Sequence, residues 1–226
     1  MKKQQPQISE DKILEASWEL LGEDGIEKFS MRRLADRLGI QAPSLYWYFK
    51  SKQELYQRLT NQVSILFLEE FQTEGDWKAQ LAAFAINLRN LLQRYPCSTQ
   101  LMMLTLPLEP GIIRFTNRML LCVESTPLEE EQKLQMVLTL TNYVLGFVLD
   151  EYQDRRNVSA MLKEKGELPI EEMVKLLDSM SEADAGLFRR MYKGELYELM
   201  GTDKAFEFGL QLILLGIEQV IKEHEK

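Results

Sequence analysis

The sequence predicts an all-α protein in which a small three-helix head precedes a larger helical body. Two observations support this fold class. Apolar residues recur at helical spacing through most of the 226 residues, and Ser, Thr, Asp, Gly and Pro stand where helices should begin and end. No segment shows the alternation of apolar and polar residues that marks a half-buried strand. We expect a head of residues 1–60 and a body of residues 61–226.

The first helix is predicted to begin after Ser9. Serine is a good N-cap, and the acidic residues Glu10 and Asp11 that follow it favour the positive end of the helix dipole. From Ile13 onward apolar residues share one face. The glycines at 22 and 25 then end the helix.

The stretch Ser30–Lys52 has the pattern of a helix-turn-helix. A short amphipathic helix ends at Gly39, a residue suited to a left-handed turn. A second short helix begins near Ala42 and Pro43, and proline is tolerated there because the first helical turn needs no N–H donor. In a DNA-binding helix-turn-helix the second helix enters the major groove, where its first residues face the base edges.

The charge is distributed unevenly along the chain. The net charge of −8, from 27 basic and 35 acidic residues, argues against nucleic-acid binding if taken as a whole. Residues 28–58, however, carry seven basic residues against two acidic ones. This asymmetry would orient the basic head toward phosphate and the acidic body away from it.

The body is punctuated by strong helix signals. Ser51–Glu54 is a capping box that opens a fourth helix, predicted to run from the head into the body and to end near Gly75. Asp76 caps a helix that stops at Tyr95-Pro96, and the prolines at 107 and 110 mark a loop. Thr126–Glu129 combines an N-cap, a Pro and a Glu, which predicts another helix start.

Two later helices are strongly apolar. One carries a wide apolar stripe from Leu134 to Tyr152, and the other, about Asp203–Lys222, is apolar nearly all round. The polar stretch Asp154–Lys165 is expected to be a loop or a short helix. Gly209 and Gly216 share one face of the last helix, where small residues would allow close approach of a partner helix. The residues alone leave ordinary packing within one chain as the alternative.

Several short runs of the head together carry a specific pattern: Ile13–Ala16, Gly25-Ile26, Arg32–Ala35, Leu38-Gly39, Pro43–Phe49 and Lys50–Lys52. In these runs the chain resembles the tetracycline repressor (TetR) family of bacterial one-component regulators. The match covers residues 9–60. Leu145–Glu151 and Ala205–Glu218 are similar to the tetracycline-repressor type of C-terminal domain. The resemblance implies a ligand-responsive, sequence-specific transcriptional regulator, with a repressor favoured over an activator. It also implies a four-helix homodimer interface and a pseudo-palindromic operator.

The residues expected to contact double-stranded operator DNA are Ser30, Arg32, Arg33, Gln41, Ala42, Pro43, Ser44, Tyr46, Trp47, Tyr48, Lys50 and Lys52. Arginine can bind guanine through two hydrogen bonds, and lysines beside a helix N-terminus suit phosphate. Ala42 stands where the tetracycline repressor carries a glutamine. Because alanine cannot read adenine through an amide pair, we expect an operator that differs from the tet operator.

The resemblance also implies an effector pocket in the body, lined by Phe67, Leu68, Phe71, Phe84, Leu88, Met102, Met103, Thr105, Arg118, Leu121, Asn142 and Phe147. Most of these positions could equally be plain core. Tetracycline repressors bind a magnesium chelate through a histidine, but the corresponding stretch Leu101–Leu104 has none. Asp150 and Glu151 occupy the position of an acidic contact near that metal. We therefore expect neither metal nor cofactor, and a small, largely apolar effector.

Other protein classes have less support. The sequence has one histidine, His224, and lacks a GxSxG motif and a phosphate-binding loop, so an all-α enzyme is disfavoured. The other alternative is an interaction protein whose head does not bind DNA, against which the basic and aromatic surface argues. Cys97 and Cys122 are expected to be reduced thiols in the core. No apolar run reaches the roughly 18–20 residues that span a bilayer, and a cytoplasmic location is expected.

Overall fold

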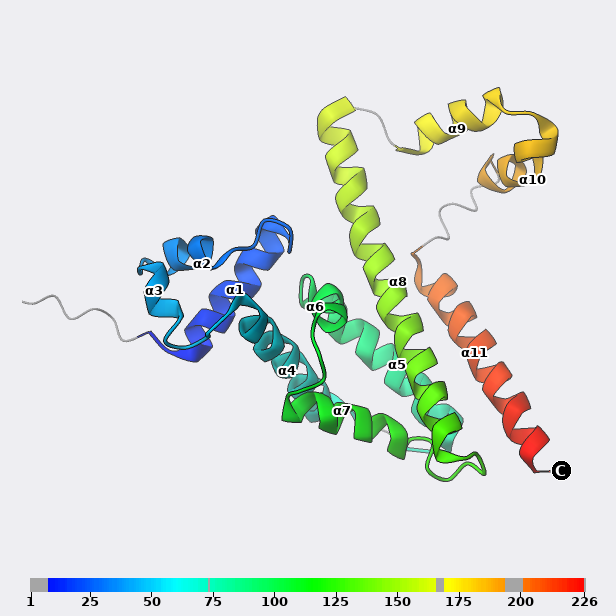
Figure 1. Ribbon diagram of the computed structural model, residues 1–226. Coiled ribbons are helices and arrows are strands. Elements are labelled where there is room, and N and C mark those ends of the chain that lie inside the picture. Colours follow the sequence, from blue (N-terminus) through cyan, green and yellow to red (C-terminus); the bar gives the residue numbers. More distant parts are fainter. Residues whose placement is uncertain (1–7, 73, 166–168, 194–200, 226) are drawn as a thin grey trace, which may run out of the picture. The chain divides into compact units, whose positions relative to one another are not determined.

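The computed structural model describes residues 8–72, 74–165, 169–193 and 201–225. Every regular element in these ranges is an α-helix, which confirms the all-α prediction (Figure 1). In chain order the helices are α1 Glu10–Asp24, α2 Met31–Leu38, α3 Ala42–Leu45, α4 Lys52–Glu70, α5 Trp77–Arg94, α6 Ser98–Leu104, α7 Pro110–Leu121, α8 Glu130–Lys165, α9 Pro169–Ser179, α10 Glu182–Lys193 and α11 Asp203–His224.

The chain divides into two compact units by its backbone contacts, Met1–Val137 and Leu138–Lys226. The division lies inside α8. This division is based on backbone contacts. The predicted boundary at residue 60 instead separates a DNA-binding part from a ligand-binding and dimerisation part, and it stays a prediction. The polar first seven residues lie outside the described part of the chain.

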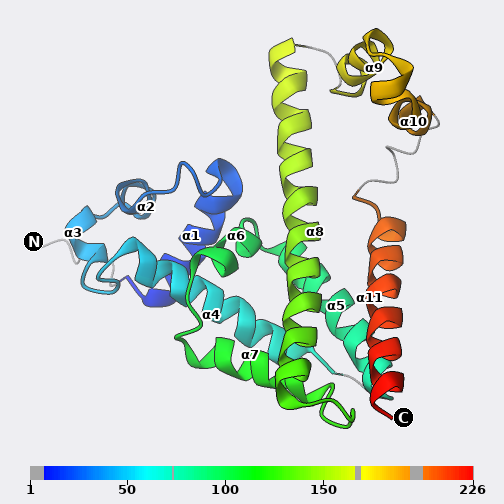
Figure 2. The same cartoon turned by 45° about the vertical axis from the view of Figure 1, so that its right-hand side comes forward.

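Helix α4 is the centre of the first unit. It packs against α5, α6 and α7, and both views show α7 beside it (Figures 1 and 2). At its other end it completes the core of the head, where α1 packs on α2 and α2 on α3. The side chains that fill the head core are buried: Ile13, Leu21, Leu34, Leu45, Phe49, Leu55 and Leu59. One continuous helix thus takes part in both the head and the rest of this unit.

Most predicted helix starts are confirmed by capping hydrogen bonds. The side chains of Ser9, Ser51 and Asp76 accept hydrogen bonds from the backbone N–H groups of Lys12, Glu54 and Ala79. In the capping box, the Glu54 carboxylate accepts from the N–H of Lys50, at 2.6 Å. Each cap satisfies a donor that the helix itself leaves unpaired.

Three predicted boundaries were wrong. Helix α4 ends at Glu70 rather than near Gly75, because Phe71 turns to an extended conformation and packs on Phe67 and Phe84. Helix α8 begins at Glu130, and Thr126 does not cap it. Instead the Thr126 hydroxyl donates to the carbonyl of Val123, at 2.7 Å.

The third error concerns Asp154–Lys165, which is the end of α8 rather than a loop or short helix. The stretch contains no Gly or Pro to stop the helix. Contacts one turn apart also support it, because Arg155 donates to the carbonyl of Glu151 and Arg156 donates to the Tyr152 hydroxyl.

In the second unit α8 and α11 pack through aromatic rings. The Tyr143 hydroxyl donates to the carbonyl of Phe206, at 2.8 Å, and the Tyr143 and Phe206 rings stack at 5.5 Å between centroids. A Cβ on Gly209 would overlap Tyr143, whereas one on Gly216 would meet nothing within 4 Å. The two glycines therefore differ: Gly209 serves packing within the chain, and Gly216 leaves an open face.

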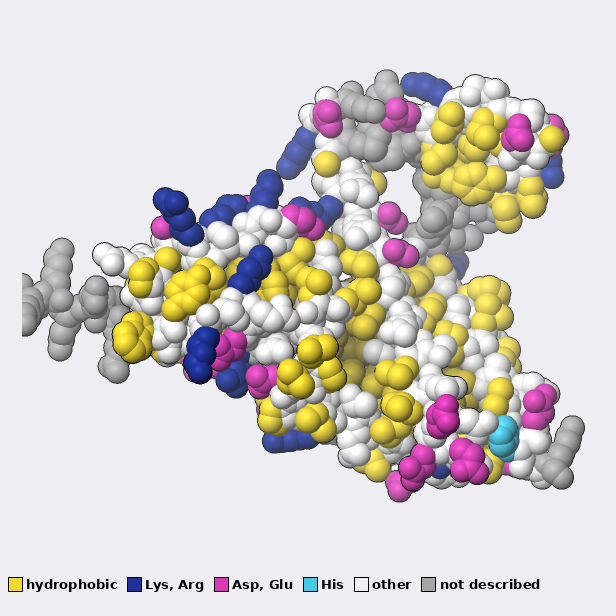
Figure 3. Space-filling view, viewed as in Figure 1, with side chains coloured by type: hydrophobic (Ala, Val, Ile, Leu, Met, Phe, Trp, Pro, Cys, Tyr) yellow, Lys and Arg dark blue, Asp and Glu magenta, His cyan; other side chains and the backbone are white. Residues whose placement is uncertain are grey.

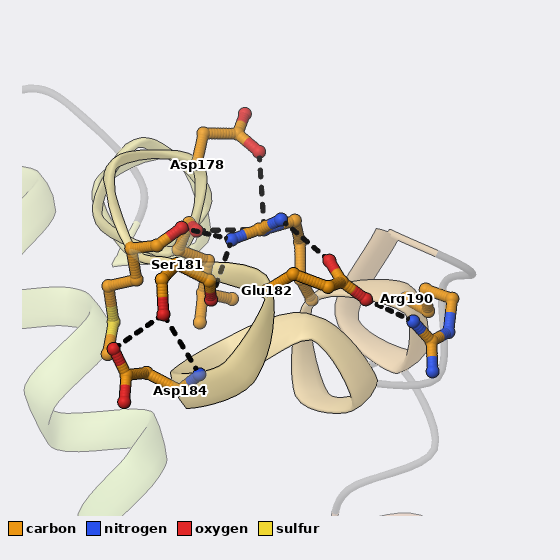
Figure 4. A network of polar contacts seen from close by, with 8 residues as sticks. Asp178, Ser181, Glu182, Asp184 and Arg190 are labelled. Atoms are coloured by element: carbon orange, nitrogen blue, oxygen red, sulfur yellow. Dashed lines mark hydrogen bonds and ion pairs between the residues drawn. The ribbon is translucent and has the colours of Figure 1, made fainter.

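Helices α9 and α10 form a hairpin held by polar contacts (Figure 4). Ser181 caps α10, accepting from the N–H of Asp184 at 3.2 Å. Arg189 reaches back to α9, where it donates to the carbonyl of Leu177 at 2.8 Å, and it also pairs with Glu182. Because arginine donates in several directions at once, one side chain joins both helices.

Candidate DNA-binding surface and effector site

The turn between α2 and α3 has the geometry of a helix-turn-helix. Gly39 adopts the left-handed conformation, with φ 66° and ψ 28°. Its N–H donates to Asp36, and the N–H of Ile40 donates to Ala35, at 3.2 and 3.0 Å. These two bonds form a Schellman motif, which ends α2 sharply and sets the direction of α3. The predicted role of Gly39 is confirmed.

Helix α3 and the turn after it present an aromatic surface. Leu45 and Phe49 are buried and anchor the segment in the head. Between them Trp47 is 90% exposed, and Tyr46 and Tyr48 are also exposed. Apolar side chains gather at this end of the head, with Lys and Arg side chains above and below them (Figure 3). An exposed tryptophan buries little area on folding, so this surface is suited to a partner.

The start of α3 leaves further side chains accessible. Gln41 is the N-cap residue, yet its side chain makes no capping hydrogen bond and is exposed. Pro43 is exposed, and Ala42 and Ser44 are half-buried. The Ser30 hydroxyl instead caps α2, where it accepts from the N–H of Arg33 at 3.2 Å. Ser30 thus has a structural role in addition to the proposed DNA contact.

The predicted cations fall into two groups. Arg32 and Lys50 are exposed and have no ion-pair partner among the described residues. Arg33 is exposed but pairs with Asp24. Lys52 is half-buried, because its ammonium donates to the carbonyl of Phe29 at 2.9 Å and lies over aromatic rings. Burial lowers the pKa of Lys52. Its hydrogen bond ties the start of α4 to the segment before α2.

The predicted effector residues of α4 and α5 form an aromatic cluster. The rings of Phe67 and Phe84 each lie 4.8 to 5.5 Å, between centroids, from each other and from the rings of Phe71 and Phe115. All four side chains are buried, as is Leu88, while Leu68 is half-buried. Sequence reasoning missed Phe115, although Phe115 and Met119 on α7 and Cys122 just after it have the spacing of a buried helix face.

The predicted residues of α6 and α7 are more accessible. Met102 is half-buried and Met103 is exposed. Thr105 donates to the carbonyl of Leu101 at 2.8 Å, and its hydroxyl lies 3.2 Å from that of Thr60 on α4. Leu121 is exposed beside a groove of ≈ 600 Å³, whose lining is Asn117, Leu120, Leu121, Glu124, Glu130, Glu131, Lys133 and Leu134.

The remaining predicted positions belong to the second unit. Asn142 is exposed on α8, and Phe147 is half-buried, with its ring 5.2 Å from that of Phe206. Glu151 is buried and Asp150 is exposed. His224 lies in the last turn of α11, where Nδ1 is 2.9 Å from the carbonyl oxygen of Val220. Within the described ranges no helix is long and apolar enough to cross a membrane.

Two family models match the chain. The model of bacterial regulatory proteins of the tetR family matches residues 13–59. The model of the tetracyclin repressor-like C-terminal domain matches residues 71–221, which is more than half of the chain. The chain belongs to the TetR family. This TetR family member is a ligand-responsive DNA-binding regulator, and the resemblance drawn from its sequence is confirmed in both parts.

The named relatives are similar to this TetR family member over nearly its whole length. The tetracycline repressor protein class G of Vibrio anguillarum is 28% identical over 215 residues, covering 92% of this chain and 92% of the relative. The class C repressor of Escherichia coli is 25% identical over 218 residues, covering 94% and 92%. A solved structure of a possible TetR family transcriptional regulator from Streptomyces coelicolor A3(2) is 25% identical, with a TM-score of 0.73, covering 93% and 98%.

Proposed function

We propose that the chain is a homodimeric repressor. It binds a pseudo-palindromic operator through α3 and the residues around it, and it leaves the operator when a small, largely apolar effector binds the body. The observation that carries the proposal is the exposure of Trp47 between two buried anchors in a helix-turn-helix of standard geometry. The names of the relatives, which are repressors, support the sign of regulation.

On DNA the exposed side chains would make two kinds of contact, one with base edges and one with phosphates. Gln41 and Pro43 lie at the start of α3, the part that reads base edges in this motif, and Tyr46 directly follows the last residue of this short helix. Arg32 and Lys50 are free to pair with phosphates, whereas the ammonium of Lys52 is already hydrogen-bonded. We therefore assign the positioning contacts mainly to Arg32 and Lys50 and give Lys52 a minor share.

The dimer interface would be formed by α8 and α11. Exposed apolar residues lie on both helices: Leu138, Phe208, Leu212, Leu215 and Val220. The open space around Gly146 and Gly216 would admit a helix of the partner at close range. Two helices from each protomer make a four-helix bundle, a frequent form of helical dimer. A monomer in light scattering at micromolar concentration would contradict this assignment.

Effector binding would act through α4. This helix contributes Leu55 and Tyr56 to the head core and Phe67 to the aromatic cluster, without a break between them. A ligand that favours a head spacing unlike that of the operator-bound state shifts the population away from DNA. A coupling of about 1–3 kcal/mol would change operator affinity about 5- to 150-fold.

The test is a selection from random duplex DNA with purified protein and with Trp47→Ala. Because Trp47 is exposed, the substitution should leave thermal stability within about 0.5 kcal/mol of the wild type. Leu187→Ala, an equally simple truncation of an exposed residue on α10, is the matched control. We expect the wild type and Leu187→Ala to enrich an inverted repeat and Trp47→Ala to fail.

A bound effector could hide the activity, so the selection is repeated on protein unfolded in urea, dialysed and refolded. Absence of an enriched repeat with the refolded wild type would overturn the proposed DNA function. Equal enrichment by Trp47→Ala would leave the dimeric regulator intact but remove the aromatic surface from its DNA contacts.

A further inference from the structure

Arg118 lies on the buried face of α7. Phe115, one turn earlier on this helix, and Cys122, which directly follows its last residue, are both buried, and so is Met119. The guanidinium carbon of Arg118 lies 5.5 Å from the centre of the Phe71 ring, at the edge of the aromatic cluster. The side chain is half-buried, so the charge is held against apolar surroundings yet remains partly accessible.

No carboxylate balances this charge among the described residues. Two other half-buried arginines differ in this respect: Arg58 pairs with Glu10 at 3.2 Å, and Arg189 pairs with Glu182 at 3.2 Å. Arg118 makes neither an ion pair nor a side-chain hydrogen bond within the part of the chain that the structure describes. A partly buried cation without a partner is costly unless something else pairs with it.

The position of the ring leaves the guanidinium free to bind an anion. The guanidinium carbon of Arg118 lies over the Phe71 ring, and a contact with a ring face uses up none of the N–H donors. Two of these donors match the two oxygens of a carboxylate. Phe71 thus gives the positive charge a cation–π contact, while the N–H donors of Arg118 stay available.

We propose that Arg118 binds the carboxylate of an acidic aromatic effector. The inference rests on the proposed effector-dependent function and sharpens it, because a largely apolar ligand then carries one negative group. The aromatic part would extend along α7 toward Leu121, which lies three residues further on and is 45% exposed. The groove beside Leu121 carries Glu124, Glu130 and Glu131, so the anionic end belongs at Arg118 and not there.

The experiment uses two matched pairs of probes: naphthalene-2-carboxylate with its carboxamide, and anthraquinone-2-carboxylate with its carboxamide. Binding to the full-length protein is measured by calorimetry at pH 7.5. The variants are Arg118→Gln, Arg118→Lys and the control Arg114→Gln. Arg114 is exposed on the same helix, so the control removes the same charge without touching the aromatic cluster. Thermal melts verify that each variant folds.

We expect the wild type to bind at least one acid about tenfold or more tightly than its amide, as for a charged hydrogen-bonded pair. Arg114→Gln should keep this preference and Arg118→Gln should lose it, while Arg118→Lys should keep only part. Three results would overturn the inference: amides that bind as well as acids, a preference that survives Arg118→Gln, or no binding of any probe to the wild type.

Operator binding without probe is measured on the same samples, which separates the two proposals. Protein that binds the selected DNA but shows no preference for the acids retains the regulatory function and loses the role of Arg118. Protein that prefers the acids through Arg118 but binds no DNA retains the anion site and loses the function.

Discussion

Replacing Tyr56 with phenylalanine should stabilise the first unit. Tyr56 is 4% exposed, and its hydroxyl has no hydrogen-bond partner among the described residues. The ring itself makes two favourable contacts. Its centre lies 5.6 Å from that of the Phe29 ring and 5.1 Å from the ammonium nitrogen of Lys52. Phenylalanine keeps these ring contacts and removes only the buried oxygen.

The size of the effect follows from the cost of burying an unpaired hydroxyl. That cost is about 1–3 kcal/mol by mutational measurement, so Tyr56→Phe should raise the free energy of unfolding by up to this amount. For a chain of this length each kcal/mol corresponds to roughly 2–4 °C in the melting temperature. Tyr56→Leu, which removes the ring as well, is the control and should be destabilising.

The pH dependence of the unfolding free energy provides a second test of the buried Tyr56 hydroxyl. Burial raises the pKa of the Tyr56 hydroxyl above its ordinary value of 10.0. Below about pH 10 both folded and unfolded chains keep the proton, and stability is unaffected. Above that pH the unfolded chain loses the proton first, so stability falls as the pH rises. Tyr56→Phe should lack this part of the alkaline decrease.

The assay is urea unfolding at pH 7.5 and at several values above pH 10, with operator affinity measured in parallel. Operator affinity should be unchanged, because the substituted ring keeps its place in the head core. A lower unfolding free energy for Tyr56→Phe at pH 7.5 would refute the reasoning, since it would mean that the hydroxyl has a stabilising partner.

Three further predictions follow from single contacts. Gly39→Ala should cost about 1 kcal/mol in urea unfolding and Gly39→Asn less, because φ is +66° there and a Cβ meets nothing within 4 Å; an equal cost for both would refute this. Lys50→Gln should reduce the salt slope of operator binding by about one, whereas Lys52→Gln should mainly lower stability, as filter binding and melts would show. Asn61→Leu should cost about 1–3 kcal/mol, because it leaves the buried N–H of Gly111 without its acceptor at 2.8 Å; Asn61→Asp should cost less.

Features that depend on residues within about one helical turn could be predicted from the sequence. Ser9 and Ser51 cap helices as expected, and Gly39 ends α2, because each such signal involves atoms no more than about five residues apart. The head could also be recognised, because its residues form a specific pattern over a short stretch. Helix ends were less predictable where packing decides them, as at Phe71.

Which of the predicted side chains are available for binding depends on long-range contacts and could not be predicted. Lys50 and Lys52 look alike in sequence, but the carbonyl of Phe29, 23 residues before Lys52, takes up one ammonium and leaves the other exposed. Arg118 and Arg114 likewise differ in the face of α7 that each occupies. Arg118 lies over the ring of Phe71, whereas Arg114 is exposed. These differences in exposure and contact arise from residues that are distant in the chain. A local sequence pattern does not specify which long-range contact forms.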